Sequence, residues 1–382
     1  DALSHVVGTL SAFDPQKNGY GFSDFKKISL SEGFQPFKQK LSFDDLAGFE
    51  NFLDSVDALI LGGKGDLDLS PLRRASLISR IFDVIQVGHP SFAGKPLYIV
   101  EDDIDPVCAW FLKTQDFLYN HKLYGRRAQD TFSLAPTLRA ALRSSKRDLN
   151  SYVRPVQMPM DKGYVDGSDK FDRPTVAILG SASTYDPQHI GIGKQFATGC
   201  AARNLHFRHG GCARGVVGGA ADAFAAYRDE NEKGRMTGIQ CHGLVRLEGI
   251  NEGNNCVKIH RTIGERKLDI YRSEILCFAA GGWGTYEELF DLLALVESGR
   301  VNPDTIIIID YPFDACKTET TYQPIRQFMD MFMTPEQIQK MNIRFVQTEE
   351  DALDIVDERL PALRAKYATP SVGRDNRAPQ IA

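Results

Sequence analysis

Apolar runs alternate with segments of helical periodicity over the second half of the chain. Continuous apolar runs typical of buried strands lie at 175–180, 206–211, 236–241, 257–260, 275–280, 304–311 and 343–348. Segments that repeat apolar residues at helical spacing lie between them, at 190–204, 218–231, 265–273, 285–297, 323–333 and 349–360. Buried strands separated by helices indicate a parallel sheet covered on both faces. The pattern therefore predicts a Rossmann-like, doubly wound α/β domain over residues 174–362.

The first 150 residues repeat part of this pattern in weaker form. The order strand, Gly-Gly-x-Gly, apolar helix, loop, strand and acidic turn occurs within 57–103 and again within 273–312. Two further strands are predicted at 6–13 and 26–31, and a helix at 42–56. We interpret residues 1–150 as a smaller, degenerate α/β domain of similar half-fold. Two parallel strand–helix units without a common origin are the alternative.

Residues 151–173 are rich in Pro, Gly, Asp and Ser and lack periodicity, which predicts a linker. Residues 363–382 are predicted to form a tail, loose from Tyr367 onward.

The two glycine loops differ in their chemistry. Aligning Gly62–Gly65 with Gly281–Gly284 places Asp66 opposite Thr285 and Leu69 opposite Glu288. A carboxylate at the mouth of a phosphate loop repels a phosphate, and a leucine cannot stabilise a cation. The first domain is therefore predicted to be structural or regulatory.

Composition narrows the class of protein. The 382 residues are 42% hydrophobic and 25% charged, with a net charge of −5, which favours neither a nucleic-acid backbone nor an anionic membrane as partner. No apolar run approaches the ~18 residues of a membrane span, and no signal-peptide pattern opens the chain. The seven cysteines are scattered without a CxxC pair, which argues against a disulfide framework or a zinc site and for a cytoplasmic protein.

Three glycine-containing loops follow predicted strands, at 180–183, 209–215 and 281–285. We expect them to converge at one edge of the sheet, where backbone N–H groups at helix starts suit a phosphate. Thr285 is expected to cap its helix, with Glu287 and Glu288 in the first turn. No acidic residue ends the second strand and no Walker lysine is present, which indicates one phosphate with a small attached group and not a dinucleotide. A tight turn without a ligand is the alternative reading of the loop at 281–285 taken alone.

Three ordered motifs in residues 174–360 resemble the LONELY GUY (LOG) family, nucleoside 5′-monophosphate phosphoribohydrolases formerly labelled lysine decarboxylases. The segment 210–223, GGCARGVVGGAADA, resembles that family's GGGSxGLMGxxADA motif. Arg266-Lys267 is similar to its RK pair, and 280–288, AGGWGTYEE, to its PGGxGTxxE motif. The chain departs from the family pattern at Ala280, Cys212 and Ala213, and the last change removes a hydroxyl near the phosphate.

The resemblance implies hydrolysis of an N-glycosidic bond to a free base and ribose 5-phosphate, without a metal or cofactor, in a homodimer. It implies catalytic roles for Arg266 and Glu288. Phosphate and substrate binding is expected from Gly180, Ser181, Gly210, Gly211, Gly215, Lys267, Gly281, Gly282, Gly284 and Thr285. The alternatives are a nucleotide or cofactor carrier that uses the same phosphate site without turnover and, for assembly, an N-terminal domain that acts as an internal partner.

The chemistry of the two catalytic candidates fits this reaction. Breaking the bond builds positive charge on the ribose, so a carboxylate at Glu288 stabilises the transition state, while Arg266 binds the phosphate or holds Glu288 ionised.

Glu287 points about 100° away and is expected to be solvated or to support the site from behind. His209 is either an acid or a packed histidine, and Cys212 is expected to be only a small residue. Trp283 is expected to wall the site or to pack on a partner subunit. No lysine lies in a context for a pyridoxal phosphate Schiff base, so lysine decarboxylation is rejected.

Overall fold

A computed structural model of the chain describes residues 6–9, 35–37, 58–61, 70–86, 97–100, 104, 106–123, 133–149, 163–167, 169, 171–183, 186–313 and 319–368. The chain divides into an N-terminal unit, Asp1–Pro159, and a C-terminal unit, Met160–Ala382. The division falls inside the segment predicted to be a linker.

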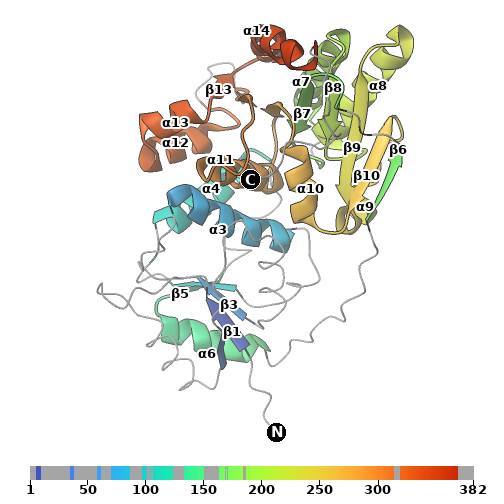
Figure 1. Cartoon of the computed structure of the whole chain (residues 1–382). Coiled ribbons are helices and arrows are strands. Elements are labelled where there is room, and N and C mark those ends of the chain that lie inside the picture. Colours follow the sequence, from blue (N-terminus) through green and yellow to red (C-terminus); the bar gives the residue numbers. More distant parts are fainter. Residues whose placement is uncertain are drawn as a thin grey trace. The chain divides into compact units, whose positions relative to one another are not determined.

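The C-terminal unit is built on an eight-stranded sheet with the order β13-β12-β11-β7-β8-β9-β10-β6 (Figure 1). All neighbouring strands are parallel except the edge pair of β10 and β6, which is antiparallel. The strands are β6 (Tyr164–Gly167), β7 (Thr175–Leu179), β8 (His206–His209), β9 (Arg235–Cys241), β10 (Cys256–His260), β11 (Ile275–Phe278), β12 (Thr305–Ile309) and β13 (Ile343–Val346).

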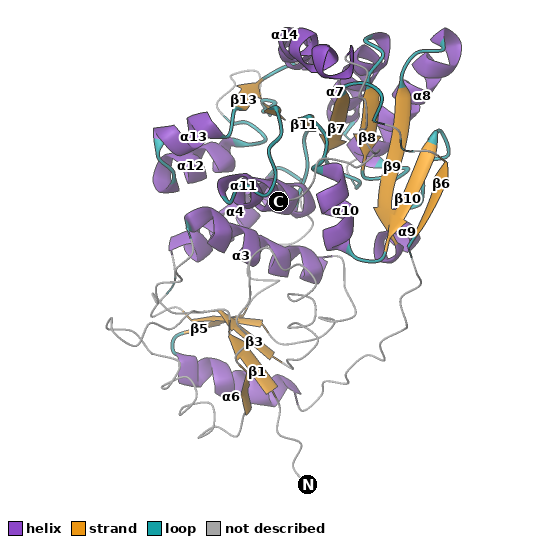
Figure 2. Cartoon of the chain, viewed as in Figure 1, coloured by secondary structure: helices purple, strands orange, loops and turns teal. Residues whose placement is uncertain are grey.

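Helices cover both faces of this sheet. Alternate strand residues such as Val176, Phe207 and Ile307 form one core with α7 (Pro187–Ala202), α8 (Gly215–Asn231) and α14 (Glu349–Ala368). Arg208 points to the opposite face, where it contacts α10 (Ile263–Ile270). The other helices of this unit are α9 (His242–Glu248), α11 (Trp283–Glu297), α12 (Gln323–Phe332) and α13 (Pro335–Lys340), seen in Figure 2.

The strand order confirms the predicted doubly wound sheet. From β7 the chain proceeds through β8, β9 and β10 in one direction, then returns to β11 on the other side of β7 and continues through β12 and β13. The direction reverses between β7 and β11, and such switch points are where ligands bind in open α/β sheets.

The N-terminal unit contains a five-stranded parallel sheet with the order β2-β1-β3-β4-β5. Its described elements are β1 (Val6–Thr9), β2 (Gln35–Phe37), β3 (Ala58–Leu61), α3 (Pro71–Gln86), β4 (Leu97–Val100), α4 (Pro106–Asn120), β5 (Ser133–Ala135) and α6 (Leu138–Leu149). The strands β8-β7-β11-β12-β13 of the larger sheet have the same neighbour order. The predicted half-fold similarity is therefore confirmed, whereas the predicted elements at 26–31 and 42–56 and the loop from Gly62 to Leu69 lie outside the described residues.

Two boundaries differ from the sequence prediction. Residues 164–167 of the predicted linker form β6, because their backbone pairs with the edge of β10. Helix α14 runs through Pro361 to Ala368, so the predicted tail begins too early. Contacts offset the cost of a proline in the helix: Leu363 is fully buried, and the Tyr367 hydroxyl lies 3.0 Å from the Glu274 carboxylate.

Within the described residues, none of the helices is both long and apolar enough to cross a membrane. The same part of the chain contains no group of three or more His, Cys, Asp or Glu side chains arranged to hold a metal ion.

Candidate functional site

Three loops meet at the carboxyl ends of β7, β8 and β11. Ser181, after β7, donates its backbone N–H to the carbonyl of Ala280 after β11, at 3.0 Å. The carbonyl of Ser181 accepts from the backbone N–H of Val216 in the first turn of α8, at 2.8 Å. The convergence expected from the sequence is therefore present, and it lies at the switch point of the sheet.

Glycine is required at several of these loop positions because neighbouring atoms come too close for a side chain. A Cβ on Gly215, whose φ is +64°, would lie 2.3 Å from the Ser181 carbonyl oxygen. A Cβ on Gly210 would lie 2.3 Å from a guanidinium nitrogen of Arg266. A Cβ on Gly281 would lie 2.0 Å from the Thr285 hydroxyl oxygen. By contrast, a Cβ on Gly180 would meet its nearest atom at 3.4 Å.

Two helices begin at this edge without a side-chain cap. Arg214 is the N-cap residue of α8 and Gly282 that of α11, and neither helix start has a side-chain cap hydrogen bond. The helix dipoles at these two starts favour an anion, and at α8 the Val216 N–H already donates to the Ser181 carbonyl. Gly211, with φ of +77°, turns the chain toward the start of α8.

Helix α11 begins two residues before the expected position. The expectation that Thr285 caps it is wrong, because Gly282 is the N-cap residue and Thr285 lies inside the first turn. Glu287 and Glu288 accordingly lie in the second turn. Between residues 279 and 296 every residue is buried except Gly282, Gly284 and Glu288, which are half-buried. These three positions mark the side of the loop and helix that reaches solvent.

Arg266 and Glu288 form an ion pair at this open side. The Arg266 guanidinium donates to the Glu288 carboxylate at 2.8 Å, to the Ile239 carbonyl at 3.1 Å and to the Gly210 carbonyl at 3.4 Å. The two side chains are 10% and 13% exposed, so the pair is nearly dry but not sealed. Tyr271 donates its hydroxyl to the Glu288 backbone carbonyl at 2.7 Å, which fixes α11 at the same residue. The structure thus brings both predicted catalytic residues together, with the Arg266 guanidinium against the loop of Gly210.

Burial and charge act in opposite directions on this pair. Burial raises the pKa of Glu288 above its usual value, and Arg266 lowers it by a smaller amount. Burial alone would lower the pKa of Arg266, but the carboxylates of Glu288 and Glu248 raise it. Glu248 also raises the pKa of Glu288. Arg266 therefore stays charged and lies between two carboxylates.

The sequence motifs do not indicate Glu248 as a residue of the site. It ends α9, and it accepts from the Gln240 side chain at 3.0 Å while its backbone carbonyl accepts from Ala213 N–H at 3.3 Å. Helix α9 itself was not predicted, because the segment from Cys241 to Glu248 has too few periodic apolar residues. The only sequence signal was an acidic residue shortly after a strand that ends at the same sheet edge.

Lys267 has a different role from the one expected. Its ammonium group pairs with the carboxylates of Glu287 and Asp291 on α11, and all three side chains are at most 3% exposed. A lysine held in this way joins α10 to α11. Glu287 is correspondingly buried and paired, which excludes the solvated one of the two alternatives expected for it.

The remaining candidates have packing roles. His209 is fully buried; it accepts from Gly211 N–H at 3.2 Å and lies 2.8 Å from the Asn254 amide oxygen. Burial lowers the pKa of His209 to about 4, so the ring is neutral near pH 7 and supports the loop of Gly211 instead of donating a proton. Burial raises the pKa of the Cys212 thiol to about 12, which leaves it unreactive. Trp283 is fully buried against Tyr286 and so packs inside the unit.

The fold and these loops define a Rossmann-like α/β domain with an anion-favouring site at the switch point of its sheet. Residues 220–358 match the family model described as "Possible lysine decarboxylase". This match agrees with the resemblance of the sequence motifs to the LOG family. The matched range contains Arg266, Glu288 and Glu248, whereas the loop of Gly210 and Gly211 precedes it.

Solved structures are similar over about half of the chain. The molybdenum cofactor carrier protein from Chlamydomonas reinhardtii is 13% identical, with a TM-score of 0.36, over 50% of this chain and 99% of that chain. The molybdenum cofactor binding protein from Rippkaea orientalis is 14% identical, with a TM-score of 0.33, over 49% of this chain and 96% of that chain. DNA processing protein A from Streptococcus pneumoniae is 15% identical, with a TM-score of 0.33, over 50% and 65%. No curated protein matches the chain in sequence.

Substituting Gly215 tests the geometry of the loop. Gly215→Ala places a Cβ against the Ser181 carbonyl at a positive φ, so we expect the free energy of unfolding to fall by about 2 kcal/mol or more. The control is Gly191→Ala in α7, where no atom lies within 4 Å of the new Cβ and stability should rise by roughly 0.5–1 kcal/mol. Urea unfolding measures both, and equal midpoints for the two variants would contradict the close approach.

Proposed function

We propose that the C-terminal unit hydrolyses the N-glycosidic bond of a nucleoside 5′-monophosphate, giving a free base and ribose 5-phosphate. The observation that carries this proposal is the nearly buried ion pair of Arg266 and Glu288 beside two uncapped helix starts. The helix starts suit a single phosphate, and the carboxylate lies in the second turn of α11, where an attached sugar would be.

Each charged group has a defined task in this mechanism. Cleavage gives the ribose ring oxocarbenium character, and the Glu288 carboxylate stabilises that charge more strongly in the transition state than in the ground state. Arg266 holds Glu288 ionised and aimed, because its guanidinium is itself fixed by the carbonyls of Ile239 and Gly210. In this proposal Glu248, whose carboxylate influences both Arg266 and Glu288, binds a sugar hydroxyl or orients the attacking water.

A nucleotide or cofactor carrier without turnover is the second candidate. The loop after β8 favours it, because Cys212 and Ala213 provide no hydroxyl there and the Cys212 thiol donates to the Arg214 carbonyl at 3.5 Å. Backbone N–H groups alone would bind the phosphate without contacting the attached sugar, which suits a carrier. Calorimetric titration that shows tight binding, together with chromatography that shows no product, would select the carrier.

The decisive substitution is at Glu288. Glu288→Gln keeps the shape but removes the negative charge, so we expect base release from a panel of nucleoside monophosphates to fall at least about a hundredfold. Glu252→Gln is the matched control, since Glu252 is exposed and is not one of the residues that form the three loops. Chromatography of the released base measures the rates, and thermal unfolding checks that both variants are folded. Equal rates for Glu288→Gln and the wild type would rule out the assigned role.

The pH dependence of the reaction reports on the same carboxylate. Because Glu288 acts ionised and its pKa is raised above the usual 4.5, we expect kcat to fall as the pH drops through that raised pKa. Glu248→Gln removes a negative neighbour, lowers the pKa of Glu288 and so shifts this acid limb to lower pH. Glu252→Gln should leave the limb in place. An acid limb that moves upward in Glu248→Gln would contradict the coupling of the two carboxylates.

A further inference from the structure

A second group of buried charges lies at the C-terminal end of α10, three residues along the helix from Arg266. Its centre is Arg208, which lies in the interior strand β8 and is fully buried. Interior strands of a parallel sheet normally carry apolar side chains, and a buried charge is tolerated only when it is paired and hydrogen-bonded. Arg208 therefore needs fixed partners, and their identity shows what it does.

The partners of Arg208 are at the end of α10. One guanidinium nitrogen donates to the Asp269 backbone carbonyl at 2.6 Å and lies 3.4 Å from the Ser273 hydroxyl oxygen. The other donates to the Asp269 carboxylate at 2.8 Å. A cation that binds both a side chain and a backbone carbonyl at a helix C-terminus fastens that end of the helix to the sheet.

Asp269 is also held by β10. Its carboxylate accepts from the Lys258 ammonium at 2.8 Å and lies 2.9 Å from a ring nitrogen of His260. Burial would raise the pKa of Asp269, but the contacts with His260, Arg208 and Lys258 lower it well below its usual range. The carboxylate is therefore ionised and binds α10 to β8 and β10 together.

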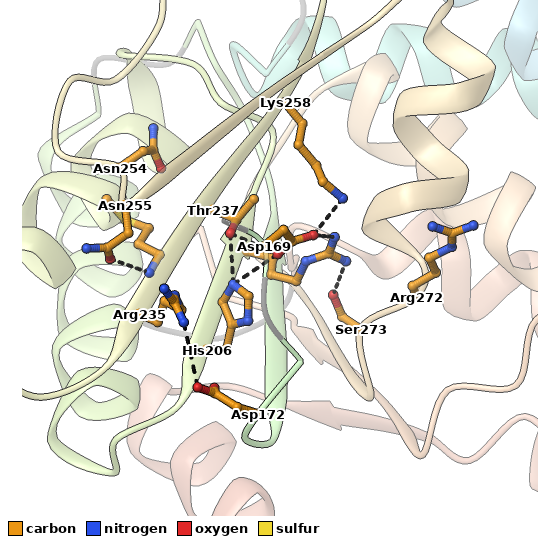
Figure 3. Close-up of polar contacts among 12 residues, drawn as sticks. Asp169, Asp172, His206, Arg235, Thr237, Asn254, Asn255, Lys258, Arg272 and Ser273 are labelled. Atoms are coloured by element: carbon orange, nitrogen blue, oxygen red, sulfur yellow. Dashed lines mark hydrogen bonds and ion pairs between the residues drawn. The ribbon is translucent and has the colours of Figure 1, made fainter. Parts of the chain in front are cut away.

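A second carboxylate in this cluster, that of Asp169, comes from the segment through which the chain enters the C-terminal unit. Asp169 follows β6, and its carboxylate lies 3.2 Å from Arg208 and 2.6 Å from the Lys258 ammonium. Figure 3 shows Asp169 between Lys258, His206 and Thr237. The side chains of β6 are exposed, whereas that of Asp169 is 5% exposed. Phe171 adds a ring whose centre lies 5.0 Å from the Arg208 guanidinium carbon.

Asp269 lies three residues after Arg266, so one short helix connects the two groups of charges. Helix α10 has eight residues, and its position on the sheet sets the position of the Arg266 guanidinium. A displacement of about 1 Å at a group that positions the reaction lowers the rate on the order of a hundredfold.

We propose that Asp169, Arg208 and Asp269 are positioning residues that hold α10, and with it Arg266, in the geometry needed for turnover. The first segment of the C-terminal unit thereby acts on the rate through Asp169. The expected effect on kcat rests on the proposed hydrolysis. The expected effect on how firmly α10 is held rests on the structure alone. The cluster does not include the loops of Ser181 and Gly281. We therefore expect its loss to disturb Arg266 and Glu288 and not the binding of phosphate at the helix starts.

The test uses Asp169→Asn in the full chain, which keeps the shape of the side chain and removes its charge. With the nucleoside monophosphate that the panel shows to be cleaved fastest, we expect kcat to fall about tenfold and KM to change less than about twofold. Asp172→Asn is the matched control, since Asp172 is 44% exposed and pairs only at the surface with Arg173 and Arg235. It should keep both constants.

Hydrogen exchange measured by mass spectrometry provides a readout that needs no substrate. Asp169→Asn should speed exchange in α10 and leave α14 unchanged, whereas Asp172→Asn should change neither. Unchanged exchange in α10 overturns the proposal, and faster exchange throughout the unit, α14 included, also overturns it in favour of general stability. If Asp169→Asn does not fold, Lys258→Gln serves instead, because it weakens the hold on both carboxylates. If the wild type cleaves no nucleotide, the proposed hydrolysis fails. Hydrogen exchange in α10 then still decides whether Asp169 holds this helix in place.

Discussion

The contact between Arg266 and Glu288 is the interaction on which the rest of the site depends. Burial raises the pKa of Glu288, and the Arg266 guanidinium lowers it, so the cation favours the ionised carboxylate. The cation is fixed by backbone carbonyls, and Gly210 has no side chain because the guanidinium occupies that space. The loop of Gly210, Arg266 and Glu288 thus depend on one another for their positions, and replacing any of them disturbs the others.

The helices α10 and α11 bring this pair together, and both are held by buried ion pairs. Lys267 joins α10 to α11, while Arg208 fastens α10 to the sheet. Buried charges add little net stability compared with apolar packing, but breaking one leaves its partners uncompensated. They therefore specify one arrangement of the two helices, which is what a site that depends on a charge contact requires.

The alternation of apolar runs and amphipathic helices predicted the fold, because burial on both faces of a parallel sheet imposes it locally. The glycine motifs predicted which loops meet, since close approach is a backbone property. Lys267 was misassigned because its partners on α11 are set by helix packing, which adjacency to Arg266 does not show. Asp169 was hidden in a polar segment for the same reason: its burial depends on Arg208, 39 residues away. The start of α11 was missed because Gly-Trp-Gly resembles a turn until the burial of Trp283 is known.

The most direct test of the account follows the oxygen of the attacking water. Hydrolysis of the bond between ribose and base in oxygen-18-labelled water places the label on the sugar carbon that carried the base, and mass spectrometry of the sugar phosphate detects it. The account predicts labelled ribose 5-phosphate and unlabelled base from at least one nucleoside monophosphate. Label found in released phosphate, or no labelled sugar phosphate from any nucleotide, would contradict it.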